Sequence, residues 1–560
     1  MKMKTTLFSL FLAIGALTIT SCSKEDNNDR EEEATFQAVQ FRMAEEGFGT
    51  ETELTRASSI PSAPALSEVG DCETETTLES EPAEKPTAAT RGVTTPTHYT
   101  IRIYEGSTLK GEMKGTFTAT GFMPDAGSPT QVMLARNHTY TFLCFNDQVT
   151  PVGDKLEVVL ANAATARIGR QQITLGTTDQ AVNLSSKHVG VRLHTQIVAK
   201  KDMPTAITAT LQSTSNSIPQ RVSYNPADGS YTSMSIGAVS PTANNSPASA
   251  EPRYFASNYG QNYAYTSTCP DYHYFLPTTD VASLNLTFSN GQIFWKQLTG
   301  STSGFTKTSH PLSANSTYLI KVKMNPNYTY LMSDGSTGTF KQTTQGGGEK
   351  IPIGLVVNQT KRIAVALHDA NGGNNCVWTT LSDWNRQLNN RTPFKDNQVN
   401  VMFNDLDGYK YTWEPGGSKD GTTIKGNSQT LYPAFYYAGV YTPGVSISGT
   451  LIGKKWHLPS AGEWIYIPKD LAWADPSRVQ LGPGEQYQWY SYLVDEAFKK
   501  VGGESIVNYS KFYWSSSEYV SLSYGYHITG LCARWNSTLG GWYTGYKGTS
   551  PLGVRSFITY

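Results

Sequence analysis

The sequence lacks the features that mark most enzymes and most proteins that bind nucleic acids. Charged residues make up only 16% of the 560 residues, and the formal net charge is −1. Without a basic excess nothing drives counterion release from phosphates, so we expect no nucleic-acid partner. No G-x-S-x-G, H-E-x-x-H, P-loop or G-x-G-x-x-G sequence occurs. We therefore predict a protein that is not an enzyme and needs no cofactor.

Cysteine is also scarce. The six cysteines show no C-x-x-C spacing, which argues against a zinc site and against a dense disulfide framework. Cys376 and Cys532 are the two near the C-terminal end, where they could pair or remain two separate apolar side chains. Asp405 and Asp407 could offer carboxylate oxygens to calcium, but two acids fall well short of a full shell, so no metal site is predicted.

The N-terminus carries a short apolar run, Leu7–Leu17, which is too short to span a membrane as a mature helix. The next residues, Ile19-Thr20-Ser21-Cys22, resemble the lipobox of bacterial lipoproteins. This resemblance implies a signal peptide over residues 1–21, acylation of Cys22 with palmitate, a tether over residues 22–35, and attachment to the cell outer membrane through the lipid. An ordinary secretory signal followed by a chance cysteine is the alternative. The lysine and acids after Cys22 resemble the export signal of surface-exposed lipoproteins, and a plain solvated tether is the other interpretation.

A short strand is expected over residues 36–43, at the start of a first β-sandwich covering residues 36–186. Within it we predict a loose acidic loop over residues 57–92, because Glu68–Lys85 is rich in Glu and Thr, and such a composition buries too little apolar surface to become ordered. Arg56 and Arg91 flank this Glu- and Thr-rich stretch. An arginine in a loose, exposed loop is a natural cleavage site, and the sequence does not favour one of the two.

Short strands with turn signals continue through residues 187–326 and predict a second β-sandwich. The segment Leu134–Phe145 enters a strand that is apolar on both faces, as expected inside a sandwich. Each sandwich carries an L-x-x-N-x-x-Y motif followed by a further apolar residue two positions on: Leu134, Asn137, Tyr140 and Phe142 in the first, and Leu312, Asn315, Tyr318 and Ile320 in the second.

Together, the lipobox, the first strand, the arginine in a loose loop and the two motifs resemble the fimbrillins, the pilus subunits of anaerobic Gram-negative commensals. This resemblance implies transthyretin-like sandwiches. It also implies that a protease cuts after the arginine, that the first strand leaves, and that an extended segment of another pilus subunit fills the groove by strand exchange.

A linker is expected over residues 327–349, followed by a last domain over residues 350–560. Three clusters in that domain resemble the "major paralogous domain" family, which is related to the fold of C-type lectins and formylglycine-generating enzymes. Ser460 and Glu463 in the first cluster have the spacing of a helix capping box. The resemblance implies a small α+β module displayed on the surface, and the residues that carry it are Trp456, Leu458, Pro459, Ser460, Glu463, Trp464, Trp514, Ser515, Ser516, Glu518 and Arg555.

The fold class expected is therefore mostly β: two tandem β-sandwiches and an α+β domain that resembles C-type lectins. The function expected is a surface lipoprotein at the tip of a pilus that binds an unidentified glycan or protein ligand through its last domain. A membrane-retained pilus anchor and a surface lipoprotein that binds or handles glycans are the alternatives. The aromatic residues Trp535, Trp542, Tyr543 and Tyr546 are consistent with a sugar-binding face and equally with a core.

The lipobox generates the first testable prediction. Replacing Cys22 by alanine removes the thiol that would be acylated, so the Cys22→Ala variant should accumulate as unprocessed precursor without lipid. Incorporation of radiolabelled palmitate into the variant at the wild-type level would contradict the lipoprotein interpretation.

Overall fold

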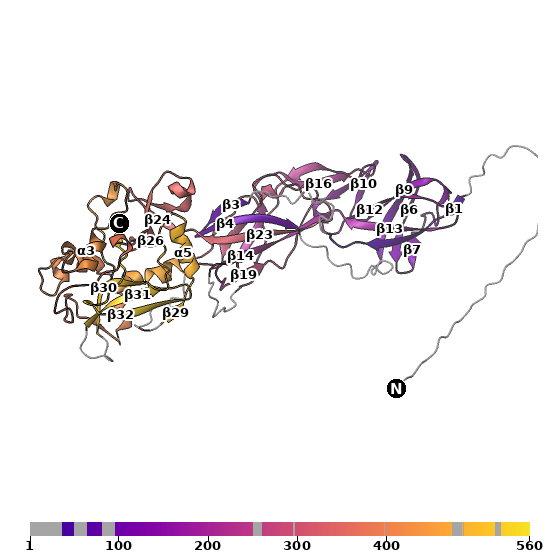
Figure 1. Cartoon of the computed structure of the whole chain (residues 1–560). Coiled ribbons are helices and arrows are strands. Elements are labelled where there is room, and N and C mark those ends of the chain that lie inside the picture. Colours follow the sequence, from indigo (N-terminus) through magenta and orange to yellow (C-terminus); the bar gives the residue numbers. More distant parts are fainter. Residues whose placement is uncertain are drawn as a thin grey trace, which may run out of the picture.

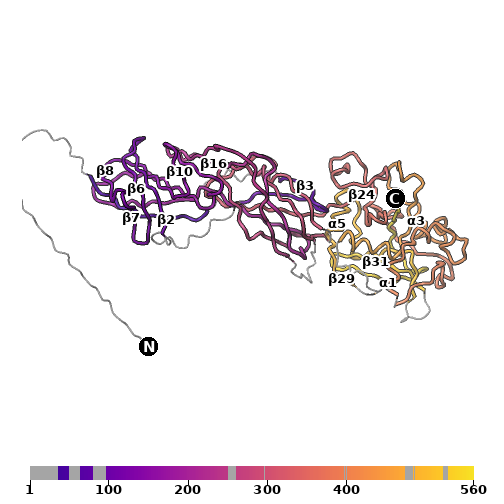
Figure 2. Tube along the Cα trace, turned by 180° about the vertical axis from the view of Figure 1, so that it is seen from behind, coloured from indigo at the N-terminus to yellow at the C-terminus, as the bar shows by residue number. Residues whose placement is uncertain are grey.

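The structure is a computed structural model, and it describes residues 36–49, 64–80, 96–249, 260–294, 297–396, 398–472, 484, 486–520 and 528–560. It is mostly β, as the sequence predicts. Figure 1 shows three regions that follow one another along an elongated molecule, which we call the N-terminal, middle and C-terminal regions. The same order is visible from behind in Figure 2. Among the residues described, no helix is long and apolar enough to cross a membrane.

The N-terminal region is built on a seven-stranded sheet. Its strands, in spatial order, are β2 (Gln40–Glu45), β13 (Ala181–His188), β12 (Arg167–Thr174), β9 (Thr139–Asn146), β5 (Thr97–Glu105), β6 (Thr108–Thr118) and β7 (Gly121–Pro124). Two smaller sheets accompany it, one of β1 (Phe36–Ala38) and β8 (Met133–Ala135), the other of β10 (Thr150–Val152), β11 (Lys155–Val159), β16 (Ile218–Tyr224) and β17 (Tyr231–Gly237).

Strand β9 is apolar on both faces because it lies between two cores. Phe142 and Cys144 belong to one buried cluster, together with the inward side chains of β2, β5 and β6. Leu143 and Phe145 point the other way, into a cluster that includes Leu156 of β11 and Val222 of β16. The two-sided pattern read from the sequence is thereby confirmed.

The middle region pairs a larger sheet with a smaller one. The larger sheet has the order β19 (Tyr265–Thr268), β14 (Val191–Ala199), β23 (Thr317–Pro326), β4 (Cys72–Ser80) and β3 (Ala65–Val69), with β20 (His273–Phe275) also pairing with β14. The smaller sheet has the order β18 (Thr242–Ala243), β15 (Thr208–Ser213), β21 (Leu284–Asn290) and β22 (Gly300–Ser301).

The motif shared by the two sandwiches forms the same structure in both. Asn137 and Asn315 adopt left-handed backbone conformations with φ angles of 62° and 60°. The hydroxyl oxygen of Tyr140 accepts a hydrogen bond from the backbone N–H five residues earlier at 3.1 Å, and that of Tyr318 does the same at 3.4 Å. A tight turn tied back by a tyrosine therefore leads into strand β9 in one region and β23 in the other.

The predicted loose loop over residues 57–92 is wrong for its described part. Residues 64–80 form the β3–β4 hairpin, which completes the larger sheet of the middle region; Figure 1 shows these indigo strands beside the much later β23. Every second residue of β4 from Cys72 to Thr76 is buried. On the opposite face, glutamates pair with lysines of β23: Glu75 with Lys323 at 2.9 Å and Glu79 with Lys321 at 2.7 Å. The acidic residues are thus ordered by cross-strand partners.

The predicted linker over residues 327–349 is also wrong. Strands β24 (Thr329–Met332) and β25 (Thr337–Thr339) lie in that stretch and join the first sheet of the C-terminal region, next to β26 (Pro352–Asn358), β27 (Ile363–Ala366) and β33 (Phe557–Thr559). The glycines that suggested a linker make tight turns instead; Gly335, for example, has a φ angle of 82°.

The rest of the C-terminal region is a second sheet with short helices around it. Its strands are β28 (Phe394–Lys395), β30 (Phe512–Val520), β31 (Ile528–Trp535), β32 (Leu539–Gly545) and β29 (Gln486–Gln488). The helices are α1 (Val399–Met402), α2 (Gly408–Trp413), α3 (Pro433–Gly439), α4 (Ala461–Trp464) and α5 (Ser491–Lys499), with one π-helical turn at Ile467–Leu471.

Helix α5 docks the C-terminal region onto the middle region. The hydroxyl of Tyr490, at the start of the helix, donates to Asp202 Oδ1 of the middle region at 2.9 Å. Ion pairs cross the contact from Lys200 to Glu496 and from Lys500 to Glu73 of β4, both at 2.7 Å. The two regions share one continuous buried core, so they form a joined unit.

The predicted capping box at the start of α4 is confirmed. The backbone N–H of Ser460 donates to Glu463 Oε2 at 2.7 Å, and the N–H of Glu463 donates to Ser460 Oγ at 3.4 Å. The Ser460 hydroxyl also donates to the carbonyl oxygen of Asp405 at 2.6 Å. It therefore connects the start of α4 to the segment that precedes α2.

Replacing Ser460 by alanine should therefore lower the free energy of unfolding of the C-terminal region by about 1 kcal/mol, the usual cost of a lost N-cap. Of the 11 tryptophans only Trp295 precedes residue 329, so intrinsic fluorescence during urea unfolding of the full chain follows this region. Ser448→Ala is the matched control, because Ser448 precedes a 3-10 turn without a side-chain cap bond. Equal urea midpoints for the two variants would show that the cap does not stabilise the region.

Candidate functional site

Three of the residues predicted to carry function lie outside the described part of the chain. These are the lipidation candidate Cys22 and the two cleavage candidates Arg56 and Arg91. Arg56 falls between Gly49 and Pro64, and Arg91 between Ser80 and Thr97. Both positions therefore separate β2 from the rest of the sheet that it joins, because β13 and β7 come later in the chain.

The motif residues of the C-terminal region form a core and not a surface. Each of the eleven is buried: Trp456, Leu458, Pro459, Ser460, Glu463, Trp464, Trp514, Ser515, Ser516, Glu518 and Arg555. Glu518 accepts hydrogen bonds from the backbone N–H groups of Leu388 and Asn389 and pairs with Lys547. Arg555 pairs with Asp369, with Nε and Oδ1 2.6 Å apart. These contacts fix loops onto strands, so a ligand cannot reach these side chains.

The structure also decides two alternatives that the sequence left open. Cys376 and Cys532 are both free thiols, so they do not form a disulfide. Trp535 and Trp542 are completely buried, and of the four aromatic residues considered for a sugar face only Tyr546, at 46% exposed, is open to solvent. The interpretation of these tryptophans as core residues is correct.

Asp405 is an internal hydrogen-bond acceptor. Its carboxylate accepts from the hydroxyl groups of Tyr411 and Ser517, and Arg391 lies 3.5 Å away. Burial raises the pKa of Asp405 to about 6, although the nearby Arg391 opposes the shift. Within the residues described, no group of three or more histidine, cysteine or acidic side chains is placed to hold a metal ion.

The candidate functional site is the place that strand β2 occupies at the edge of the N-terminal sheet, between β13 and the apolar core, which we call the seat of β2. β2 runs parallel to β13, with Gln40 opposite Ala181 and Glu45 opposite Ser186. The side chains of Val39, Phe41 and Met43 point inward and are at most 5% exposed. The strand is thus held by one backbone ladder and one row of apolar side chains.

The Phe41 ring anchors the centre of this row. It packs edge-on against Phe122 of β7 at 6.3 Å and against Phe142 of β9 at 5.9 Å between ring centroids. Edge-on contacts of this kind add to the burial of apolar area.

Polar contacts close the C-terminal end of β2. The hydroxyl of Tyr99 donates to Glu45 Oε1 at 2.7 Å, and burial raises the pKa of Tyr99 well above its usual value, so it remains a donor. The backbone N–H of Glu46 donates to the Ser186 carbonyl at 2.9 Å, and Arg167 Nη1 donates to the Glu46 carbonyl at 2.9 Å.

The chain then crosses to the middle region. The Phe48 ring stacks on His188 with centroids 3.8 Å apart, and the Arg192 guanidinium carbon lies over the Phe48 ring, 4.9 Å from its centroid. Gly49 exchanges backbone hydrogen bonds with Asn315 and Thr317, at the shared tyrosine motif of the middle region. The first segment therefore bridges both sandwiches.

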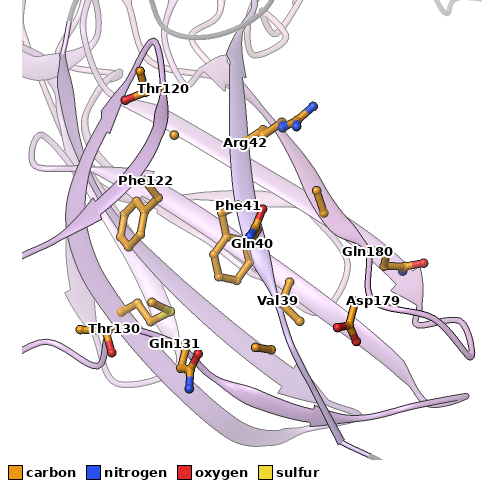
Figure 3. Close-up of a pocket in the computed structure, with 14 residues that line it drawn as sticks. Val39, Gln40, Phe41, Arg42, Thr120, Phe122, Thr130, Gln131, Asp179 and Gln180 are labelled. Atoms are coloured by element: carbon orange, nitrogen blue, oxygen red, sulfur yellow. The ribbon is translucent and has the colours of Figure 1, made fainter. Parts of the chain in front are cut away.

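On its other edge β2 faces a groove. The spatial order of the sheet ends at β2 on one side and β7 on the other, and no ladder joins these two strands. A groove of about 650 Å³ lies there, with Val39, Phe41, Met113 and Phe122 among its apolar lining residues. Figure 3 shows β2 running through this groove, with the Phe41 ring against the strand and the Phe122 ring to its left, facing Phe41.

The sequence predicted a removable first strand but gave no sign of the groove beside it. The apolar alternation over residues 36–43 predicted one strand, but the structure has two there, β1 and β2, in different sheets. The gap between β2 and β7 depends on how far a sheet of seven strands curls. The β3–β4 hairpin was missed because the lysines that pair with its glutamates lie in distant parts of the chain.

No family model matches the chain, and no curated protein matches it. Among solved structures, a fimbrial protein from Bacteroides ovatus is similar at a TM-score of 0.27 and 10% sequence identity, covering 94% of this chain and 100% of that one. A fimbrial protein from Bacteroides vulgatus is similar at a TM-score of 0.26 and 12% identity, covering 41% of this chain and 91% of that one.

The stack of Phe48 on His188 generates a pH prediction. Burial, together with the neighbouring Arg167, lowers the pKa of His188 to about 3. The unfolded chain takes up a proton near pH 6.5 while the folded chain does not, so stability should fall as the pH drops below 6.5 toward 3. At pH 5 this single group should cost on the order of 2 kcal/mol relative to pH 7.5.

The measurement is the urea midpoint of the full chain followed by circular dichroism at pH 7.5 and pH 5. The His188→Phe variant is the control, because it retains a ring against Phe48 but cannot titrate. A wild-type midpoint that falls no further than that of the variant would contradict this account of His188.

Proposed function

We propose that this chain is a surface lipoprotein that forms the tip subunit of a fimbrillin-type pilus. Its first strand, β2, leaves after cleavage at an arginine, and an extended segment of a neighbouring subunit takes its place. The observation that carries this proposal is the seat of β2: an edge strand near the N-terminus, held by a single ladder to β13 and a row of inward apolar side chains. A segment of another chain can supply the same backbone hydrogen bonds and the same row.

The position at the tip is argued from the other end of the chain. A subunit within a shaft must also donate an extended segment. Here the C-terminal residues are tied in on both sides: Val365 pairs with Phe557 in the ladder between β27 and β33, and His457 exchanges two backbone hydrogen bonds with Phe557 at 2.9 and 3.0 Å. Phe557 and Ile558 are at most 1% exposed. Each buried backbone group left without a partner costs about 1–3 kcal/mol, so withdrawal of this strand is strongly disfavoured.

The C-terminal region would then face outward and bind a glycan or protein on another surface. Since the motif residues are buried, ligand contacts must come from exposed side chains. Tyr509 is 73% exposed, and Tyr546 is 46% exposed with the Trp384 ring 5.9 Å away. Exposed aromatic side chains of this kind are suited to apolar faces of a ligand.

Immunogold labelling of pili with antibody against the C-terminal region tests the proposal. We expect one label at the distal end of each filament. Purified protein treated with an arginine-specific protease should not polymerise by itself, because it accepts a strand without donating one. Label along the whole shaft, label only at the membrane, or self-polymerisation would each contradict the proposed position.

A further inference from the structure

The first segment has four inward-facing positions, and they are not equally well suited to the interior. Gln37, Val39, Phe41 and Met43 alternate with outward residues, and all four are 2–5% exposed. Phe41 and Met43 belong to the main core of the N-terminal region, as does Val39. The first of the four positions is therefore a polar residue in an otherwise apolar row.

Gln37 is poorly accommodated. Its side chain is 2% exposed, and neither its amide nitrogen nor its amide oxygen has a hydrogen-bond partner within the described part of the chain. A buried amide without partners loses its hydrogen bonds to water and gains none in exchange, so it opposes the seating of β1 between the core and β8. An apolar residue at this position would remove that penalty.

Val39, at the next position, has the smallest of the four inward side chains. The groove of about 650 Å³ between β2 and β7 lies directly beside it, and Figure 3 shows Val39, Gln131 and Phe122 among the residues that line it. Phe122 is half-buried, so a larger side chain in the place of Val39 would extend toward an apolar ring that is still partly open to solvent.

The other half of the segment fits well. Phe41 contacts two aromatic rings, and Glu45 accepts a hydrogen bond from Tyr99. The mismatch is therefore confined to the N-terminal half of the strand, and both of its causes, an unpaired amide and a small side chain, act in the same direction.

We propose that β1–β2 is an incomplete occupant of its own groove, and that the groove favours a replacing strand with apolar residues at all four inward positions and a large one, leucine or an aromatic residue, in the place of Val39. This inference rests on the proposed strand exchange and specifies the chemistry of the incoming strand. Such a strand gains contacts that the native segment does not make, so the exchange proceeds toward the replacing strand without an external energy source.

The test uses the full chain after treatment with an arginine-specific protease. Three fluorescent peptides spanning residues 36–49 are compared by anisotropy: the native sequence, the Gln37→Leu/Val39→Phe variant, and the Ala44→Phe control. The control adds a large apolar side chain at an exposed outward position that does not line the groove. We expect the inward variant to bind at least about tenfold more tightly than the native peptide, which corresponds to ~1.4 kcal/mol, and the control to match the native peptide.

Equal binding of all three peptides, or an equal gain for the control, would overturn the inference and leave strand exchange standing. Absence of binding by any peptide would overturn strand exchange itself. A second measurement is independent of exchange: the uncleaved chain carrying Gln37→Leu/Val39→Phe should melt at a higher temperature than the wild type. An unchanged or lower melting temperature would show that the native strand already fills its groove.

Discussion

Backbone hydrogen bonds made by residues 36–49 and 64–80 tie together strands that lie far apart in the sequence. β2 completes the N-terminal sheet by pairing with β13, and the β3–β4 hairpin completes the middle sheet by pairing with β23. Between them, Gly49 bonds to the tyrosine motif of the middle region. Ladders of this kind need only a backbone in register, and this is the property on which the proposed strand exchange rests.

The same segment also connects the sandwiches to the C-terminal region. Glu73 of β4 pairs with Lys500, whose ammonium group lies 5.0 Å from the centre of the Phe340 ring. Helix α5 contributes the adjoining contacts, so the C-terminal region is held at a defined position on the end of the middle region. A ligand-binding region carried on such a joined unit would transmit load to the sandwiches through packed side chains.

Local signals in the sequence predicted local structure well. The prediction of the capping box is correct because Ser460 and Glu463 are three residues apart and need no distant partner. The prediction of a strand that is apolar on both faces is correct because each face of β9 packs into a separate core. The loose loop predicted over residues 57–92 was wrong for the opposite reason: Glu79, Glu75 and Glu73 are paired with lysines 242, 248 and 427 residues away, which composition alone cannot reveal. The groove beside β2 likewise depends on the curvature of a whole sheet, and nothing in the residues around Gln37 indicates that its amide becomes buried.

The central claim is that β2 must leave its groove for the subunit to join a pilus. Arg42 and Asn183 are opposite one another in the parallel ladder, and both are exposed, so paired cysteines at these positions should form a disulfide that locks β2 in place. The measurement is the amount of the Arg42→Cys/Asn183→Cys variant found in purified pili, with and without reductant. We predict exclusion from pili when the disulfide is formed and incorporation once it is reduced. Incorporation of the locked variant at the wild-type level would contradict the account.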